Sequence, residues 1–229
     1  MPRSDYLAAL AATLPAGAEA LHCGADGIAY LIQPGCVEPI DPTRRPPQSD
    51  LLPFIDAGHF TRYLIGAADS SDTNPSNATY KLGVVAAHRG FTPHAHGAEH
   101  FVLSTGYAAC GLYDAQRDAV VNVRLTPGTL LHIPALMPHS FNNRSAEPLL
   151  LMVANTGMGI DHEDYAITAA QAAERAVSGV TNLDYPSMAT ALRRLERELP
   201  VLNAQHRMGW REQLARRLRA VAERLEFAR

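Results

Sequence analysis

One short stretch constrains the fold of this chain more than any other: His94-Ala-His96-Gly-Ala-Glu99-His100. Side chains two residues apart leave the same face of a β-strand, whereas on a helix they point in different directions. A strand is therefore the local structure that presents the imidazoles of His94 and His96 together. The clustering of four ligand-type side chains favours a metal site over a histidine-rich surface loop, and imidazole with carboxylate suits Fe, Mn, Ni, Cu or Zn.

A second stretch supplies another candidate ligand, His139. The two stretches together resemble the two sequence motifs of the cupin superfamily. The first motif reads His-x-His, a short gap, a ligand residue such as Glu, six residues and Gly, and here it ends at Gly106. The second reads Gly, five residues, Pro, four residues, His, three residues and Asn, and every spacing is matched by Gly128, Pro134, His139 and Asn143. The resemblance spans residues 80–155 and implies a jelly-roll barrel with one metal site.

The chain departs from this pattern in two glycines and leaves one ligand open. The glycine usual six residues before the first histidine is His88 here, and the glycine often found two residues after the motif proline is Leu136. Counting back from Gly106 selects Glu99 as the ligand that follows the His-x-His pair, whereas counting forward from His96 selects His100. Alternation along a strand allows only one of these two side chains to point into a barrel. The candidate metal ligands are therefore His94, His96, Glu99, His100 and His139.

Short segments of five to eight residues, separated by turn residues, predict an antiparallel β-barrel between residues 51 and 157. The resemblance sharpens this expectation to a double-stranded β-helix, the cupin jelly roll, in a mainly β protein. Within it, Tyr80, Leu82 and Val84 alternate with Lys81, which predicts a half-buried strand whose apolar side chains face the core.

Extensions are expected on both sides of this barrel. Residues 1–50 are predicted to hold a helix over 4–22, a strand over 27–32 and a proline-rich connector, because proline is excluded from helix interiors and central strands. Residues 158–229 are predicted to be helical. A capping box at Thr168 and Gln171 begins one helix, Pro200 ends the next, and an apolar stripe follows from Trp210 to Leu225.

Composition limits the partners. The net charge of −3 gives no general affinity for nucleic acid, and no apolar run is long enough to span a membrane. Three cysteines without CxxC spacing, and no secretory signal, predict reduced thiols and a cytoplasmic location. The helical tail and the sheet edges suggest a homodimer. The basic residues are 19 arginines and a single lysine, Lys81.

The resemblance implies a metal-dependent enzyme that binds a small organic substrate, because similar cupins with such ligands are often Fe(II) dioxygenases or oxygenases. Fe(II) is the expected ion and dioxygen an expected co-substrate, although Mn, Ni, Cu or Zn would also suit the ligands. One alternative is a redox-neutral lyase, isomerase or hydrolase, with His132, Tyr107 or the unused member of the Glu99–His100 pair as its base. Another is a cupin that binds a small ligand without catalysis.

Overall fold

The computed structural model describes residues 3–18, 20–24, 28–40, 52–65, 78–156, 166–178, 183–205 and 208–227. The chain divides into two compact units, Met1–Pro47 with Met208–Arg229, and Gln48–Arg207. The first unit contains α1 (Arg3–Thr13), β1 (Ala20–Cys23), β2 (Ala29–Gln33), β3 (Cys36–Ile40) and α4 (Trp210–Glu226). The second contains β4 (Leu52–Phe54), β5 (Asp56–Ile65), β6 (Ala78–Val85), β7 (His94–His96), β8 (Glu99–Ser104), β9 (Ala108–Asp114), β10 (Ala119–Leu125), β11 (Leu130–Ile133), β12 (His139–Asn143), β13 (Leu149–Thr156), β14 (Ala166–Thr168), α2 (Ala169–Ser178) and α3 (Tyr185–Gln205).

The first unit is a three-stranded antiparallel sheet, β1-β2-β3, with α1 packed on it through Leu7 and Ala11. The predicted helix over residues 4–22 is too long: α1 ends at Thr13, and the turn that follows contains Gly17 in the left-handed region at a φ of 82°. The predicted connector also holds a strand, β3. Its proline is tolerated because β3 is an edge strand of this sheet.

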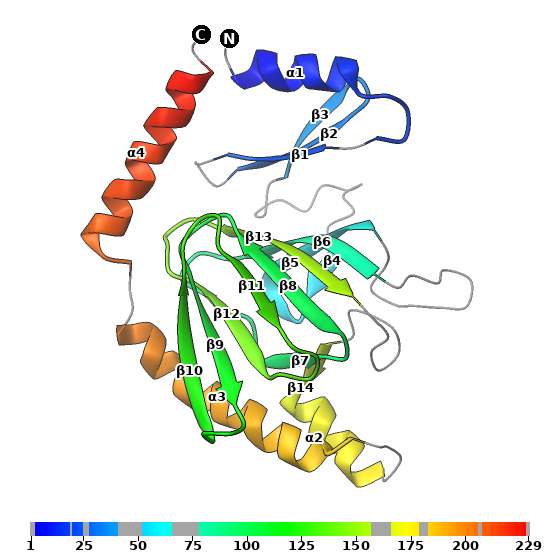
Figure 1. Ribbon diagram of the computed structural model, residues 1–229, viewed down its shortest axis with the longest axis vertical. Helices are drawn as coiled ribbons and strands as arrows, with labels where there is room; N and C mark the ends of the chain where they lie inside the picture. The colour runs from blue at the N-terminus through cyan, green and yellow to red at the C-terminus, as the bar shows by residue number, and fades with distance from the viewer. Residues whose placement is uncertain are drawn as a thin grey trace. The chain divides into compact units, whose positions relative to one another are not determined.

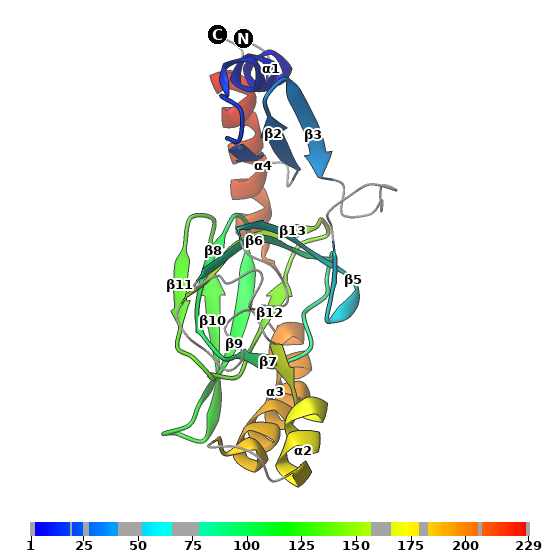
Figure 2. The same cartoon turned by 90° about the vertical axis from the view of Figure 1, so that its right-hand side faces the viewer.

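The second unit is a barrel made of two antiparallel sheets (Figures 1 and 2). One sheet has the strand order β10-β9-β12-β7-β14, and the other has the order β11-β8-β13-β6-β5-β4. Consecutive strands often lie in opposite sheets, as in a jelly roll, in which strands from two sheets enclose one core. The predicted fold class, a mainly β jelly-roll barrel with C-terminal helices, is confirmed.

The space between the sheets is filled by apolar side chains of both. Its buried core includes Phe91, Val102, Cys110, Phe141 and Val153. Burial also raises the pKa of the Cys110 thiol, which is therefore protonated and inert.

The strand β6 differs from the prediction. It is buried on both faces rather than one, because Lys81, Leu82 and Val84 are all less than 4% exposed. The expectation that Lys81 faces solvent is wrong. Its partner residue on β13, Val153, belongs to the interior core, so Lys81 projects into the barrel with it.

Helices α2 and α3 cover the outer side of the five-stranded sheet, next to β9 and β14 (Figures 1 and 2). The predicted capping box is confirmed, because the Thr168 amide donates to Gln171 Oε1 at 2.9 Å and the Gln171 amide donates to Thr168 Oγ1 at 3.4 Å. A Cβ atom at Gly111 would lie 2.3 Å from Leu199 Cδ2, so glycine lets α3 approach the sheet closely.

Pro200 does not end α3, contrary to the prediction, since the helix continues to Gln205. The packing of Leu192, Leu195 and Leu199, all 4% exposed or less, holds the helix to the barrel unit on the turns that precede the proline. The predicted C-terminal helical region is thus divided: α2 and α3 belong to the barrel unit, whereas α4 belongs to the first unit. In the described part of the chain, no helix has both the length and the apolarity needed to cross a membrane.

Candidate metal centre

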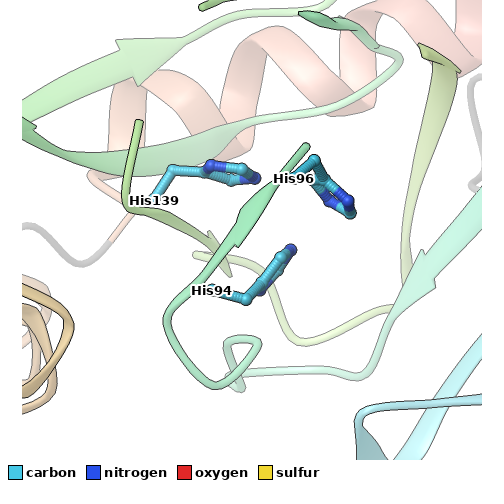
Figure 3. A group of neighbouring side chains, drawn as sticks. All are labelled: His94, His96 and His139. Carbon is cyan, nitrogen blue, oxygen red and sulfur yellow. The ribbon is translucent and has the colours of Figure 1, made fainter. Parts of the chain in front are cut away.

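The structure brings three of the predicted ligands together inside the barrel. His94 and His96 lie on β7, and His139 lies on the neighbouring strand β12, directly opposite His94 in the register. One ring nitrogen from each of the three lies within 4.8 Å of the others, and all three side chains are buried. Figure 3 shows the three imidazoles turned toward a common point. The two motifs, 43 residues apart at His96 and His139, therefore converge because β12 pairs with β7.

Hydrogen bonds fix the orientation of two of these rings. His94 Nδ1 donates to the carbonyl of Thr92 at 2.7 Å, and His139 Nδ1 donates to the carbonyl of Met137 at 2.8 Å. A carbonyl can only accept, so Nδ1 carries the proton in both rings and Nε2 keeps its lone pair. Donation from the far nitrogen to a carbonyl is the usual arrangement of a metal-binding histidine.

A carboxylate supports the His94 ring from further out. Asp56 accepts hydrogen bonds from both the amide and the hydroxyl of Thr92, each at 2.6 Å. Since the Thr92 carbonyl in turn holds His94, Asp56 fixes the segment that aims this imidazole. Asp56 lies on β5, so this chain of contacts links the two sheets at the site.

The electrostatics favour neutral imidazoles. Burial lowers the pKa of His139 to about 3. The neighbouring His94 also lowers this pKa, whereas the hydrogen bond to the Met137 carbonyl raises it. Burial also lowers the pKa of His96 well below its ordinary value, with further lowering from the neighbouring histidines and Lys81. A metal binds the neutral form of imidazole, so these rings are ready to act as ligands near neutral pH.

The alternation of β8 separates the two remaining candidates. His100 points inward and is 4% exposed, with its ring centroid 4.4 Å from that of His96 and 5.0 Å from that of His139. Its Nδ1 is hydrogen bonded to Asn155 Oδ1 on β13. The side chain of Glu99 points outward and is 55% exposed, 3.9 Å from His132 Nε2. The structure therefore places His100, and not Glu99, beside the three histidines.

The donor set fits a divalent transition metal. Zinc–nitrogen distances are about 2.1 Å, so two nitrogens on one ion are at most about 4.2 Å apart. The nitrogens of the three histidines lie within 4.8 Å of one another, so a bound ion would draw them slightly closer together. His139 Nε2 is a buried polar atom with no hydrogen-bond partner among the described residues, which is the expected state of a ligand atom that faces an ion site.

Both missing motif glycines fall at positions that need the backbone conformation typical of glycine. His88 has a φ of 53° and Leu136 a φ of 64°, both in the left-handed region. Leu136 still donates its amide to the His96 carbonyl at 2.8 Å, which ties the second motif to β7. The turns have therefore kept the backbone that the motif requires, although the residue that adopts it most easily is absent.

The motif residue Asn143 has a structural role. Its Nδ2 donates to the carbonyls of Val85 and Glu147, at 3.2 and 2.5 Å, and its Oδ1 accepts from the Ser145 amide at 2.8 Å. These bonds join β6 to the turn after β12. His132, a candidate base for the redox-neutral alternative, does not lie with the site histidines, since its side chain is 48% exposed and stacks on Phe101.

Sequence reasoning missed the polar residues on the inner face of the six-stranded sheet. They are Asn155, Lys81, Thr79 and Thr61, and each is 3% exposed or less. No sequence pattern pointed to Asn155, because its role depends on its pairing with His100 on the neighbouring strand. Lys81 did have one, as the only lysine in a chain with 19 arginines, although its apolar neighbours pointed to the opposite orientation.

Comparisons with known proteins add structural likeness without a sequence match. No protein-family profile and no curated protein sequence matches the chain. Among solved structures, oxalate decarboxylase from Lactobacillus farciminis in its formate complex is 18% identical over 61% of this chain and 40% of its own, with a TM-score of 0.44. DMSP lyase DddQ from Ruegeria pomeroyi is 22% identical over 47% and 49%, with a TM-score of 0.37. KdgF from Halomonas is 14% identical over 47% and 86%, with a TM-score of 0.36.

This chain covers less than half of the decarboxylase and of the lyase. The assignment of the fold rests instead on the molecule itself: two antiparallel sheets enclose one core, and the histidines of both motifs meet on adjacent strands inside it. On this topology and this placement of its two motifs, the chain has the cupin fold.

Proposed function

We propose that the protein is a mononuclear metal-dependent enzyme in which His94, His96, His100 and His139 hold one divalent ion. The observation that carries this proposal is the convergence of three buried imidazoles whose nitrogen atoms lie within 4.8 Å of one another. His100 is the proposed fourth ligand because its ring lies among the other three and its Nδ1 is held by Asn155. Glu99 is not proposed, because its carboxylate is on the outer face.

Within this class we propose an Fe(II) oxygenase or dioxygenase that acts on a small organic substrate. When bound, the metal would supply Lewis acidity or, if it is iron, one-electron chemistry with dioxygen. The chain's own residues orient the ligands, exclude water through the apolar core around Phe91 and Phe141, and keep the imidazoles neutral. If the four histidines hold a six-coordinate ion, coordination positions would remain for substrate.

The redox-neutral alternative, a lyase, isomerase or hydrolase, needs a base near the ion. Two of the bases considered for it, Glu99 and His132, lie on the outer face, and His100 is the proposed ligand. Tyr107 is buried and remains a candidate, so this class is the second choice. A cupin that binds a ligand without catalysis is the third.

The test is metal reconstitution followed by a substrate screen. Protein stripped with a chelator is loaded with Fe(II) under argon or with Zn(II), metal content is measured by elemental analysis, and oxygen uptake is followed with an electrode. The oxygenase proposal predicts uptake by the Fe(II) form alone and no turnover without oxygen. Turnover by both forms, independent of oxygen, would favour the redox-neutral class. Full metal loading without turnover would favour simple binding.

We also propose that the protein forms a homodimer through α4. Five large apolar side chains of this helix are at least 47% exposed: Trp210, Leu214, Leu218, Val221 and Leu225. Apolar side chains at this spacing form a stripe along a helix, and such a stripe is normally covered by a partner. Sedimentation equilibrium should give twice the chain mass, and Leu218→Glu should give a monomer. A wild-type monomer would contradict this proposal.

A further inference from the structure

A further buried histidine lies on β5, outside the four histidines of the candidate metal centre. His59 is 1% exposed, and neither of its ring nitrogens forms a hydrogen bond with any described residue. Its ring centroid lies 4.7 Å from that of Phe91, and the Phe91 centroid lies 6.2 Å from that of His94. Phe91 belongs to the interior core, so His59 points into the same interior as the proposed ion site.

A carboxylate faces one nitrogen of this ring. Asp56 Oδ2 lies 3.6 Å from His59 Nδ1, slightly beyond hydrogen-bond distance, and catalytic hydrogen bonds are often this long before substrate binds. Each oxygen of Asp56 accepts a hydrogen bond of 2.6 Å from Thr92, so the carboxylate is fixed in position. A carboxylate only accepts, so it favours the tautomer with the proton on Nδ1 of His59, which leaves the lone pair on Nε2.

The surroundings keep the ring of His59 neutral and also offer a counter-charge to its protonated form. Burial lowers the pKa of His59, Asp56 raises it, and the charge of Arg89 lowers it. The net direction is downward, so Nε2 holds a free lone pair near neutral pH. A neutral imidazole that is oriented by a fixed carboxylate is the usual arrangement of a general base.

A hydroxyl lies two residues further along the same side of β5. Thr61 is 2% exposed, and its Oγ1 is buried without a hydrogen-bond partner among the described residues. Alternate side chains of a strand stand about 7 Å apart, and one oxygen atom can bridge that span with two hydrogen bonds of about 3 Å each. Buried polar atoms are nearly always hydrogen bonded, so His59 Nε2 and Thr61 Oγ1 together call for water or a polar ligand atom.

We infer that His59 is an acid–base residue of the barrel, which takes a proton from a substrate hydroxyl held by Thr61, with Asp56 as the carboxylate that orients the ring. The proton passes to Nε2, the electron pair of the O–H bond stays on the substrate oxygen, and the resulting imidazolium lies beside Asp56. His59 later returns the proton to the product or to water. This inference rests on the proposed function for a substrate beside the ion, and it gives the class of that substrate: a small molecule with an ionisable hydroxyl group.

The first test needs no substrate. Diethyl pyrocarbonate acylates an imidazole through an unprotonated nitrogen, and mass spectrometry locates the modified residues. In protein incubated with Zn(II) at neutral pH, His59 should be modified, since a site that admits substrate also admits this small reagent. Asp56→Asn should slow the modification of His59, because the ring loses the carboxylate that holds its tautomer. The modification of His132, which has a carboxylate 3.9 Å away but is 48% exposed, should keep its rate and serves as the matched control.

Nitrogen NMR on histidine-labelled protein reads the tautomer directly. The His59 ring should carry its proton on Nδ1 and none on Nε2, and the spectrum of His59→Gln identifies its signals. With a substrate identified in the reconstitution screen, His59→Gln should lower kcat about 100-fold or more, as for loss of a general base. It should also flatten the fall of kcat/KM at acidic pH, and added imidazole should restore part of the activity of His59→Ala. His132→Ala should show none of these changes.

Modification of His132 but not of His59 in wild-type protein would overturn the inference, and so would a proton on Nε2 of His59. An unchanged rate in Asp56→Asn would overturn the role of the carboxylate. If that variant does not fold, the reactivity and tautomer of His59 in wild-type protein decide. Zinc uptake is measured on the same samples. Uptake without reaction at His59 would contradict the acid–base inference alone, and reaction at His59 without uptake would contradict the metal site alone.

Discussion

Two pairs of side chains, each made of a histidine and a residue with an acceptor oxygen, lie on opposite faces of the sheet at strand β8. Comparing them shows how the two faces of one strand give similar side chains different environments. On the inner face, His100 is paired with Asn155, and both are buried. On the outer face, His132 lies 3.9 Å from Glu99, and both side chains are about half exposed. Glu99 and His100 are adjacent in sequence, so a single step along the strand separates a buried histidine cluster from a solvated contact between Glu99 and His132.

The largest expected effect is loss of metal from the inner face. His139→Ala removes one of the three nitrogens of the central triad, so metal content after dialysis should fall from about one ion per chain to well below one, because only two nitrogens of the triad remain. Elemental analysis after dialysis measures it. The matched control is His132→Ala on the outer face, which should retain its metal. Metal loss in the control instead would break the distinction between the faces.

The adjacent pair gives a sharper version of the same test. His100→Ala should weaken metal binding strongly, whereas Glu99→Ala should leave it unchanged, because only the first side chain lies among the other histidines. Competition with a metal-sensitive dye measures both affinities. The reverse order of effects would mean that β8 carries its acidic residue inward when the metal is bound.

Asn155 should have a smaller effect, since it contacts the proposed ligand His100 and not the proposed ion site. Asn155→Leu leaves Nδ1 of His100 without its partner and frees the ring to turn. Loss of such a supporting bond typically costs about 10- to 100-fold in metal affinity. Asn155→Asp should restore much of the affinity because it preserves the acceptor oxygen. Equal affinity in all three proteins would show that the bond does not position the ring.

The inner histidines should also make metal-free protein sensitive to acid. Burial lowers the pKa of His139 to about 3, whereas in the unfolded chain it is near 6.5. The unfolded state therefore binds more protons below about pH 6.5, so stability is complete above that pH and falls as the pH drops toward the folded value. Urea unfolding between pH 7.5 and 5 measures the slope. His139→Ala should flatten it, and His132→Ala should not.

The smallest effect belongs to the outer pair. The contact between Glu99 and His132 is solvated, and even a full ion pair at an exposed site contributes only about 0–1 kcal/mol. Glu99→Gln should therefore change the free energy of unfolding by less than about 1 kcal/mol. Thermal unfolding with and without 1 M salt would detect a larger contribution, and such a result would mean that the outer face is structurally coupled to the site.

The sequence predicted the barrel, its strands and the central triad because each depends on short-range patterns. His94 and His96 are two residues apart, and the spacing of the second motif located His139. The choice between Glu99 and His100 could not be made, because it depends on the register of β8 against β11 and β13. His100 lies opposite Ile133 and Asn155, and only those long-range pairs fix its direction.

Other features also depended on contacts that leave no local pattern. Lys81 was expected to face outward because apolar residues alternate with it, but β6 is buried on both faces. The helix α4 was assigned with the other C-terminal helices. It belongs to the first unit through contacts such as that between Arg3 and Glu223, at 3.0 Å and 220 positions apart in the chain. Pro200 is a local signal for the end of a helix, but α3 continues past it, because tertiary packing outweighs this local preference.

The left-handed turns at His88 and Leu136 bear on how such chains are detected. At both sites the main chain has the left-handed conformation, although the glycine that usually adopts it is absent. A search that compares amino-acid types counts a mismatch at each of these two positions, whereas a search that compares main-chain conformation would count none. Divergent chains with the cupin fold are thus better sought by the dihedral angles of their turns than by the glycines usually found there.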